Sequence, residues 1–234
     1  MTMSLTLQER YDNVLAEVRE QSVACGRPAD AVRLIAVSKT AGPEAIAEAI
    51  DAGAQDLAEN RPDRIVEMSG LFPQVRWHFI GNIQSRRIHD IVASAALVHS
   101  LYQLRHAEKI DAAAAALDKV QDVLIEVNVS GEESKSGAAP DEAAELVRAC
   151  AALPHVRVRG LMTMAPQGNA QVAKECFEGL AALAQDIRAQ LDEADAVHFS
   201  ELSMGMSEDW PEAVAAGATM VRVGRAIFSS AFEA

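Results

Sequence analysis

Residues 32–39 read VRLIAVSK, an apolar run rich in β-branched side chains that ends in Ser38 and Lys39. A strand that is apolar on both faces is typical of a parallel sheet covered by helices, because both sides of such a sheet are buried. An amphipathic segment at 5–25 precedes this run, and a helical pattern at 43–52 follows it. Proline and glycine mark the ends of both segments, as expected at helix boundaries. The sequence therefore predicts a helix followed by a buried parallel strand and a second helix.

The same alternation continues to the end of the chain. Further strands are predicted at 56–60, 76–81, 97–101, 122–129, 156–164, 199–204 and 220–228, with helices at 62–69, 84–94, 103–117, 141–153, 170–191 and 208–216. Eight strands in strict alternation with helices at this length favour a closed (β/α)8 barrel, the TIM-barrel fold. An open doubly wound sheet is disfavoured, because no glycine fingerprint follows the first strand. We predict one α/β domain over residues 1–234, with the extra N-terminal helix completing the outer ring.

Composition excludes several classes of function. The 234 residues carry a net charge of −13, and 50% of them are hydrophobic. Such an acidic globular chain disfavours contact with nucleic acid or an anionic membrane, and no apolar run is long enough to span a bilayer. The three cysteines are widely spaced and the six histidines lack metal-ligand spacing. We therefore expect a cytoplasmic protein without a metal site.

Lys39 is the most informative candidate site residue. Active sites of this fold lie at the C-terminal ends of the strands, and Lys39 is the one lysine of five that ends an apolar strand. Desolvation there disfavours the ammonium form and prepares the amine to form a Schiff base with an aldehyde or ketone. A lysine that simply leaves the strand into solvent is an equally good reading of the position alone.

Glycine-containing turns after the seventh and eighth strands predict a phosphate site. Backbone N–H groups at Gly205 and Gly224, with the hydroxyls of Ser203 and Ser207, are placed where this fold commonly binds phosphate. Taken with Lys39, these turns indicate a phosphorylated aldehyde, held covalently at one end and by hydrogen bonds at the other.

Several motifs resemble those of one protein family. They are AVSK at 36–39, EN at 59–60, WHFIGNIQ at 77–84, VNVS at 127–130, KSG at 135–137, LSMGMS at 202–207 and VRVG at 221–224. Together they resemble the pyridoxal phosphate homeostasis proteins, which are similar to the N-terminal barrel of alanine racemase, the type III fold of pyridoxal-phosphate proteins without its C-terminal β-domain. The resemblance implies that pyridoxal 5′-phosphate (PLP) is the cofactor.

The resemblance also implies roles for individual residues. Lys39 would carry PLP as a Schiff base, and Arg222 would face the pyridine nitrogen and keep it unprotonated. The remaining residues implied to lie around the cofactor are Asn60 and His78 near the ring, Ser203, Gly224 and Arg225 at the phosphate, and Met204 beside them. The chain departs from the family pattern at four places: Leu57-Ala58 replaces Phe-Gly, Arg225 replaces a small hydroxyl residue, QSRR at 84–87 replaces an Asn-Lys pair, and Ser229-Ser230-Ala231 replaces the closing glycine-arginine.

The resemblance favours a carrier over an enzyme. Racemases of this barrel type use the lysine and a tyrosine from an additional β-domain as two bases, whereas here the two tyrosines are Tyr11 and Tyr102, outside the motifs. We therefore assign no catalytic residue and expect a PLP-binding protein of PLP homeostasis, a monomer or weak dimer. It would release PLP by transimination to amines or PLP-dependent apoenzymes. The alternatives are a weak PLP-dependent racemase or related amino-acid enzyme, and a cofactor-free Schiff-base aldolase.

Overall fold

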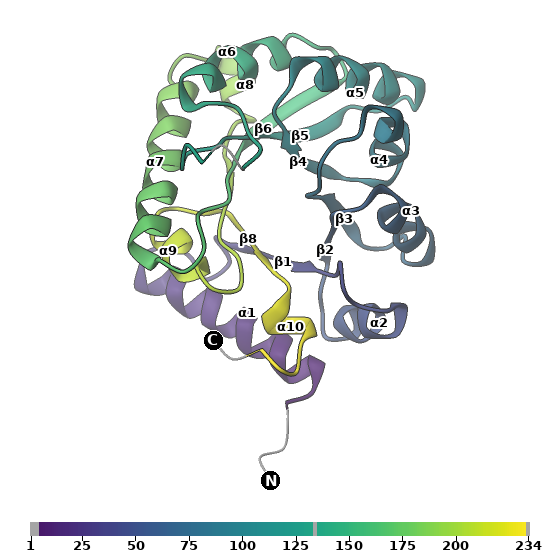
Figure 1. Ribbon diagram of the computed structural model, residues 1–234, viewed down its shortest axis with the longest axis vertical. Coiled ribbons are helices and arrows are strands. Elements are labelled where there is room, and N and C mark those ends of the chain that lie inside the picture. The colour runs from purple at the N-terminus through teal and green to yellow at the C-terminus, as the bar shows by residue number, and fades with distance from the viewer. Residues whose placement is uncertain (1–4, 133–134, 233–234) are drawn as a thin grey trace.

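Eight parallel strands form a closed barrel in the computed structural model, which describes residues 5–132 and 135–232. The strands pair in sequence order, and β8 closes the ring against β1 (Figure 1). Their bounds are β1 Arg33–Val37, β2 Asp56–Glu59, β3 Arg76–Phe79, β4 Leu97–Leu101, β5 Gln121–Glu126, β6 Val156–Met162, β7 Glu201–Ser203 and β8 Met220–Val223. The predicted (β/α)8 barrel is confirmed.

The helices form a ring outside the barrel. They are α1 Leu7–Ala24, α2 Pro43–Asp51, α3 Pro62–Leu71, α4 Ile88–Ser94, α5 Leu104–Ala116, α6 Pro140–Ala151, α7 Ala170–Arg188, α8 Glu193–Ala196, α9 Trp210–Ala215 and α10 Arg225–Phe228, with a 3-10 turn η1 at Ser85–Arg87. A capping box between Thr6 and Glu9 starts α1, and a proline in the first turn starts α2, α3, α6 and α9. Helix α1 packs beside α2, α9 and α10 and so completes the ring as predicted (Figure 1).

Some predicted strands are shorter in the structure. The strand expected at 220–228 ends at Val223, and Arg225–Phe228 forms the short helix α10 instead. The strand expected at 122–129 ends at Glu126, and the Asn128 side chain bonds the following loop: its Oδ1 accepts the Gly131 N–H at 3.1 Å. Such an Asx-type turn competes with strand pairing. Short strands leave longer loops at the C-terminal end of the barrel, where a site is expected.

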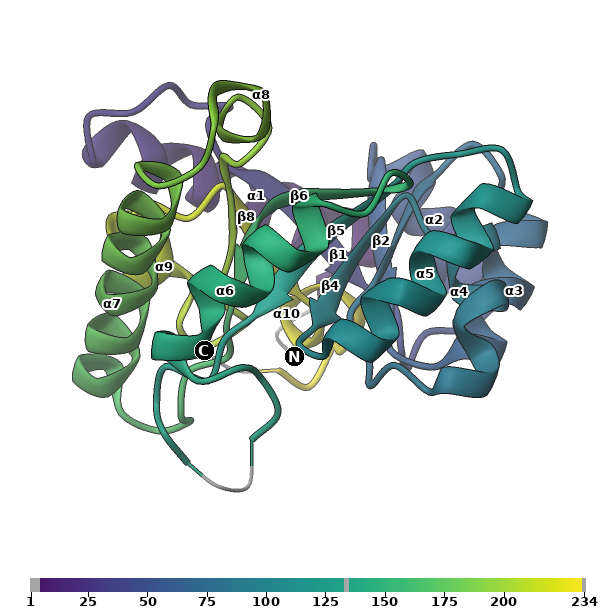
Figure 2. The ribbon, with the colours of Figure 1, turned by 90° about the horizontal axis from the view of Figure 1, so that it is seen from above.

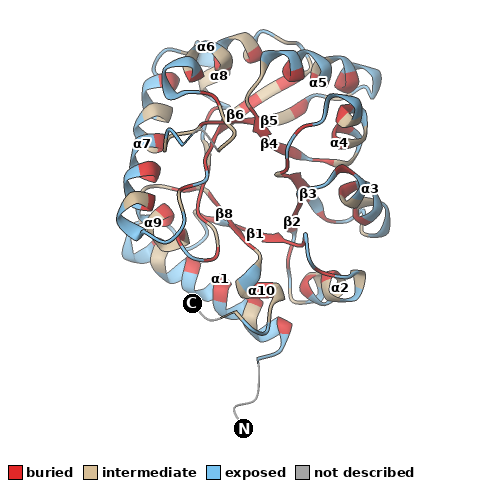
Figure 3. Ribbon diagram, in the orientation of Figure 1, coloured by how far each residue is buried: buried red, intermediate tan, exposed pale blue. Residues whose placement is uncertain are grey.

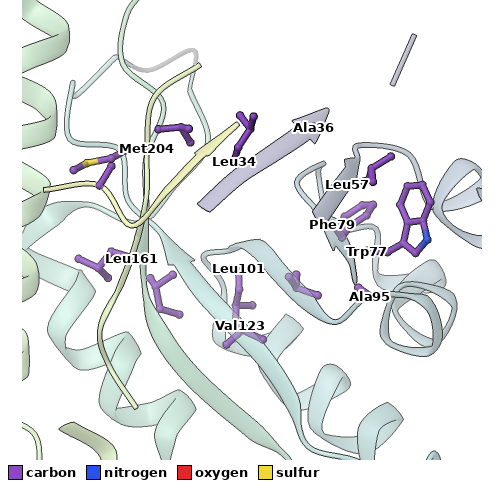
Figure 4. Packing of buried hydrophobic residues seen from close by; sticks show 14 of the residues in the cluster. Leu34, Ala36, Leu57, Trp77, Phe79, Ala95, Leu101, Val123, Leu161 and Met204 are labelled. Carbon is purple, nitrogen blue, oxygen red and sulfur yellow. The ribbon is translucent and has the colours of Figure 1, made fainter. Parts of the chain in front are cut away.

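The apolar residues divide into two groups because successive side chains of a strand point to opposite faces. Leu34 and Ala36 of β1 face the helices and join the main core, whereas Ile35 and Val37 face the barrel interior. Figure 4 shows part of the main core, with Trp77 and Phe79 packed outside the barrel wall. Figure 3 shows that the strands are buried and that the helices expose their outer faces. Each fully buried large side chain of this kind contributes roughly 1.5–3 kcal/mol.

The two ends of the barrel differ. In Figure 2, α8, which precedes β7, lies at one end, and the loop between β5 and α6 projects from the other. The second end is therefore the C-terminal end of the strands, to which Ser38-Lys39 and the turns after β7 and β8 also belong.

Candidate functional site

A cavity of ≈ 640 Å³ opens at the C-terminal ends of the strands. Its size lies within the range of small-molecule and cofactor sites. The residues that line it and enter the argument below are Lys39, Asn60, Gly81, Glu126, Ser207, Glu208, Asp209, Arg222, Gly224 and Arg225. The cavity lies at the end of the barrel where the sequence predicts the site, and residues from the ends of all eight strands line it.

Lys39 lies in the turn that follows β1 and faces this cavity. Its neighbour Ser38 is buried, and the Ser38 Oγ donates a hydrogen bond to Glu59 Oε1 at 2.7 Å. This contact joins the ends of β1 and β2, so that Lys39 and Asn60 both line the cavity. The desolvated environment that we expected for Lys39 is wrong, because its side chain is exposed. Lys39 thus reaches solvent at the strand end while it also lines the cavity.

Gly81 fixes the wall of the cavity between β2 and β3. A Cβ atom at this position would lie 1.8 Å from the Asn60 carbonyl oxygen, far inside van der Waals contact. The Gly81 carbonyl oxygen in turn accepts a hydrogen bond from Ser100 Oγ at 2.6 Å. The glycine of the WHFIGNIQ motif therefore permits a close approach of two backbones beside Asn60.

The turns after β7 and β8 meet at one side of the cavity. The Gly224 N–H points at Ser207 Oγ, at 3.4 Å, and a Cβ at position 224 would lie 3.0 Å from the Val37 carbonyl oxygen. Arg225 lies at the rim, where its Nη2 is 2.8 Å from Glu208 Oε1 and its guanidinium lies over the Phe232 ring. Its side chain is 53% exposed. This corner offers a hydroxyl, a backbone N–H and a guanidinium to an anionic group.

Arg222 connects the cavity to the barrel interior. It is buried, and its Nη1 donates to Ser203 Oγ at 2.7 Å. Ser203 Oγ lies 2.8 Å from His99 Nδ1, and His99 Nε2 lies 2.9 Å from His78 Nδ1. His78 Nε2 then reaches Asp56 Oδ1 at 2.9 Å. We call these five residues the interior polar chain.

The proton positions along the interior polar chain follow from its two ends. Burial alone raises the pKa of Asp56, but hydrogen bonds from Arg76 and His78 outweigh it and hold that pKa well below its usual range. Burial lowers the pKa of both His78 and His99, so both rings are neutral. A carboxylate only accepts and a guanidinium only donates. In each hydrogen bond of the chain the donor therefore lies on the Arg222 side and the acceptor on the Asp56 side. This arrangement holds the Arg222 guanidinium in place.

Replacing His99 with leucine tests this chain. The variant His99→Leu removes the acceptor for the Ser203 hydroxyl and the donor to His78, which leaves two buried polar groups without a partner. We expect the free energy of unfolding to fall by about 3 kcal/mol, measured by urea denaturation. The control His89→Leu lies on the exposed face of α4 and should change stability by less than about 0.5 kcal/mol. Equal stability of the two variants would contradict the chain.

Glu126 is the last residue of β5 and is 3% exposed. Leu124, two residues earlier, belongs to the interior cluster, so Glu126 also points into the barrel, at the floor of the cavity. Burial raises the pKa of Glu126 to about 7, against the opposing effect of the Arg222 charge. Near neutral pH this carboxyl group therefore takes up and releases a proton.

The variant Glu126→Gln should change the pH dependence of stability. The ordinary pKa of 4.5 rises to about 7 on folding. The protonated carboxyl is therefore compatible with the fold below pH 4.5, and an ionisation penalty develops as the pH rises from 4.5 to 7. That penalty amounts to roughly 3 kcal/mol. Because glutamine cannot ionise, the variant should gain stability relative to the parent protein as the pH rises from 5 to 8, as measured by urea unfolding. If the difference in free energy of unfolding between the two proteins is the same at pH 5 and pH 8, the raised pKa of Glu126 is contradicted.

Comparison with known proteins places the chain in a family. The family model for the alanine racemase N-terminal domain matches residues 13–231. The pyridoxal phosphate homeostasis protein of Pseudomonas aeruginosa is 38% identical, with 96% of each chain covered. That of Aquifex aeolicus is 35% identical, over 94% of this chain and 96% of the relative. This chain belongs to the pyridoxal phosphate homeostasis protein family.

Solved structures agree with this membership. PipY of Synechococcus elongatus, a structure with PLP bound, has a TM-score of 0.78 and 32% identity, over 92% of this chain and all of that chain. An unknown protein from Bifidobacterium adolescentis has a TM-score of 0.89 and 32% identity, over 95% of this chain and 94% of that chain. Alanine racemase of Clostridium difficile has a TM-score of 0.66 at 18% identity, over 91% of this chain and 55% of that one, which supports the fold alone.

The structure brings together five of the eight residues that the family resemblance implied. Lys39, Asn60, Arg222, Gly224 and Arg225 line the cavity. Three others do not: Ser203 and His78 lie deeper in the barrel, within the interior polar chain, and Met204 is buried in the core outside the barrel wall. Two residues take their place, Ser207 and Glu126. The sequence marks Ser207 as a hydroxyl residue in a glycine-containing turn. For Glu126 the available signal is the alternation of side chains along a strand, which places Glu126 on the same face as Leu124.

Proposed function

We propose that this chain binds PLP in the cavity as a Schiff base on Lys39 and releases it by transimination, as a protein of PLP homeostasis. The observation that carries this proposal is that Lys39, Asn60, Arg222 and Gly224 line the same cavity. Residues 1–234 would act as one cofactor-binding domain. No residue is assigned a catalytic role.

The residues present fit the cofactor. Ser207 Oγ, the Gly224 N–H and the Arg225 guanidinium would receive the phosphate, at a corner where a Cβ on residue 224 would crowd Val37. Arg222, held by the interior polar chain, would meet the pyridine nitrogen as a donor. With a pKa of about 10, lowered by burial, Arg222 stays charged at neutral pH. A charged guanidinium disfavours a proton on that nitrogen, which weakens the cofactor as an electron sink.

Lys39 would act as the exchangeable attachment point. PLP, when bound, would supply an aldehyde carbon with which the Lys39 amine would condense with loss of one water molecule. An incoming amine would add to that carbon and displace Lys39 as the free amine. The exposed position of Lys39 in the turn after β1 gives an incoming amine access to it. PLP-dependent apoenzymes, whose own lysine supplies such an amine, would be the recipients.

A carrier is favoured over a racemase by the lining of the cavity. A two-base racemase needs a second base across the ring from the lysine, but no tyrosine is found among the described residues that line the cavity. Tyr11 is buried on α1 in the core. The relatives at 35–38% identity are likewise named as homeostasis proteins. We propose that the protein acts as a monomer or weak dimer.

A cytoplasmic site of action is part of this proposal. Cys25, Cys150 and Cys176 are all free thiols, as is usual in a reducing compartment. Within residues 5–132 and 135–232, no helix combines the length and the apolar character that crossing a bilayer requires.

Absorption spectroscopy tests the proposed function. Addition of PLP to the purified protein should produce a visible band of a protein-bound Schiff base, and a primary amine such as a free amino acid should shift that band as the cofactor leaves. No exchange of the amino acid's α-hydrogen for solvent deuterium should accompany this release. A protein that stays colourless would contradict binding, and rapid α-hydrogen exchange that depends on Lys39 would instead support the racemase alternative.

A further inference from the structure

Glu126 is a buried carboxyl that no described residue pairs with directly. The other buried carboxyl of the barrel interior, Asp56, receives hydrogen bonds from Arg76 and His78. Glu59 accepts one from Ser38. For Glu126 only burial and the more distant charge of Arg222 act on the carboxyl group. A polar group at 3% exposure that lacks a partner in the protein and faces a cavity is placed to bond a ligand.

The charged groups that line the cavity bear on whether Glu126 binds a ligand in its neutral or its ionised form. Three other charged groups line the same cavity, Arg222 on β8, Asp209 after β7 and Lys39 after β1, and of these the Arg222 charge acts on the Glu126 carboxyl. Asp209 is already engaged, because its Oδ1 accepts the Met206 N–H at 2.6 Å. Glu208 and Arg225 pair with each other at the rim, and the lining residues from β3, β4 and β6 are uncharged.

The ligand in turn presents acceptors. The PLP ring carries a phenolic oxygen and an unprotonated pyridine nitrogen, and its phosphate is anionic. A neutral carboxylic acid donates one hydrogen bond, whereas a carboxylate only accepts and would repel the ligand in a low-dielectric site. Arg222 supplies one donor, and a protonated Glu126 would supply a second.

We propose that Glu126 binds the cofactor ring as a neutral carboxylic acid, so that binding requires a proton on Glu126 and weakens when that proton is lost. This inference rests on the proposed function and adds a specific positioning group to it. Because the proton is taken up near neutral pH, cofactor retention by this protein is coupled to the pH of its surroundings.

Pyridoxine 5′-phosphate tests this inference, because the alcohol cannot form a bond with Lys39. Its dissociation constant is measured by titration calorimetry from pH 6 to pH 9 for the parent protein, Glu126→Gln and the control Glu48→Gln, whose glutamate is exposed on α2. Ionisation of the ligand affects all three proteins alike and cancels in the ratio. Glutamine keeps a donor at position 126 but cannot ionise.

The expected result is a ratio of parent to Glu126→Gln dissociation constants that is near one at pH 6. Above pH 7 the ratio should rise about tenfold for each pH unit. Glu48→Gln should follow the parent protein at every pH. A constant ratio across the range, with both proteins binding, would overturn the role of Glu126 and leave the proposed function standing. A failure of both proteins to bind at any pH would contradict the proposed function itself.

Discussion

Lys39→Ala is expected to abolish the visible band that PLP produces with this protein. Alanine has no amine, so no Schiff base forms at the C-terminal end of β1. The cavity keeps its remaining contacts in this variant, namely Arg222, Ser207 and the Gly224 N–H. PLP should therefore still bind, but more weakly and without an adduct that borohydride can reduce. Spectroscopic titration followed by reduction and intact-mass measurement checks this expectation.

Lys135→Ala is the matched control for Lys39→Ala. Lys135 is the other lysine near the cavity: its Nζ lies 3.3 Å from the Met164 carbonyl oxygen, and Met164 lines the cavity. Lys135 also pairs with Glu132 at 3.2 Å, which directs its amine to the loop. The control should keep the full adduct. An adduct that survives Lys39→Ala and disappears with Lys135→Ala would assign the cofactor to the loop lysine instead.

Gly81→Ala is expected to destabilise the fold and damage the site together. The added methyl group would meet the Asn60 carbonyl oxygen at 1.8 Å, and neither backbone can yield without moving the ends of β2 and β3. We expect the free energy of unfolding to fall by about 3 kcal/mol or more. PLP affinity should fall as well, because Asn60 moves with the wall of the cavity. Urea denaturation and PLP titration measure the two effects.

Gly70→Ala adds the same methyl group, but it is expected to stabilise the protein. Gly70 lies in the exposed last turn of α3, and a Cβ there meets nothing within 4 Å. Alanine favours the helix over glycine, so this variant should gain about 0.5–1 kcal/mol. Similar effects of the two substitutions would contradict the close approach at Gly81.

Much of the fold was predictable from the sequence because local patterns and tertiary packing agree. The run at 32–39 and its seven successors are strands in the structure, with most boundaries within a few residues. The exceptions lie where side chains or turns end a strand early. Asn128 bonds its own loop just after β5 ends, and the chain turns into α10 after Gly224. An apolar run such as AIF at 226–228 reads equally well as strand or helix.

The site was predictable in outline but not in depth. Position at a strand end placed Lys39 and Gly224 near the site, because the fold brings all such ends to one face, and the family resemblance added Asn60. Sequence motifs do not say how far into the barrel a side chain reaches. The LSMGMS motif therefore predicts Ser203 at the phosphate site, whereas in the structure Ser203 bonds Arg222 and His99 in the barrel interior. Ser207 lines the cavity instead. The interior polar chain became visible only when five strands were brought together.

Borohydride reduction of the PLP-loaded protein, followed by peptide mass mapping, tests the central claim most directly. Reduction converts a Schiff base into a stable secondary amine, which marks the attached lysine. The account predicts one modified peptide, with the added mass on Lys39 and not on Lys109, Lys119, Lys135 or Lys174. A reduced adduct on any of those four lysines, or none at all in a protein that has taken up PLP, would contradict it.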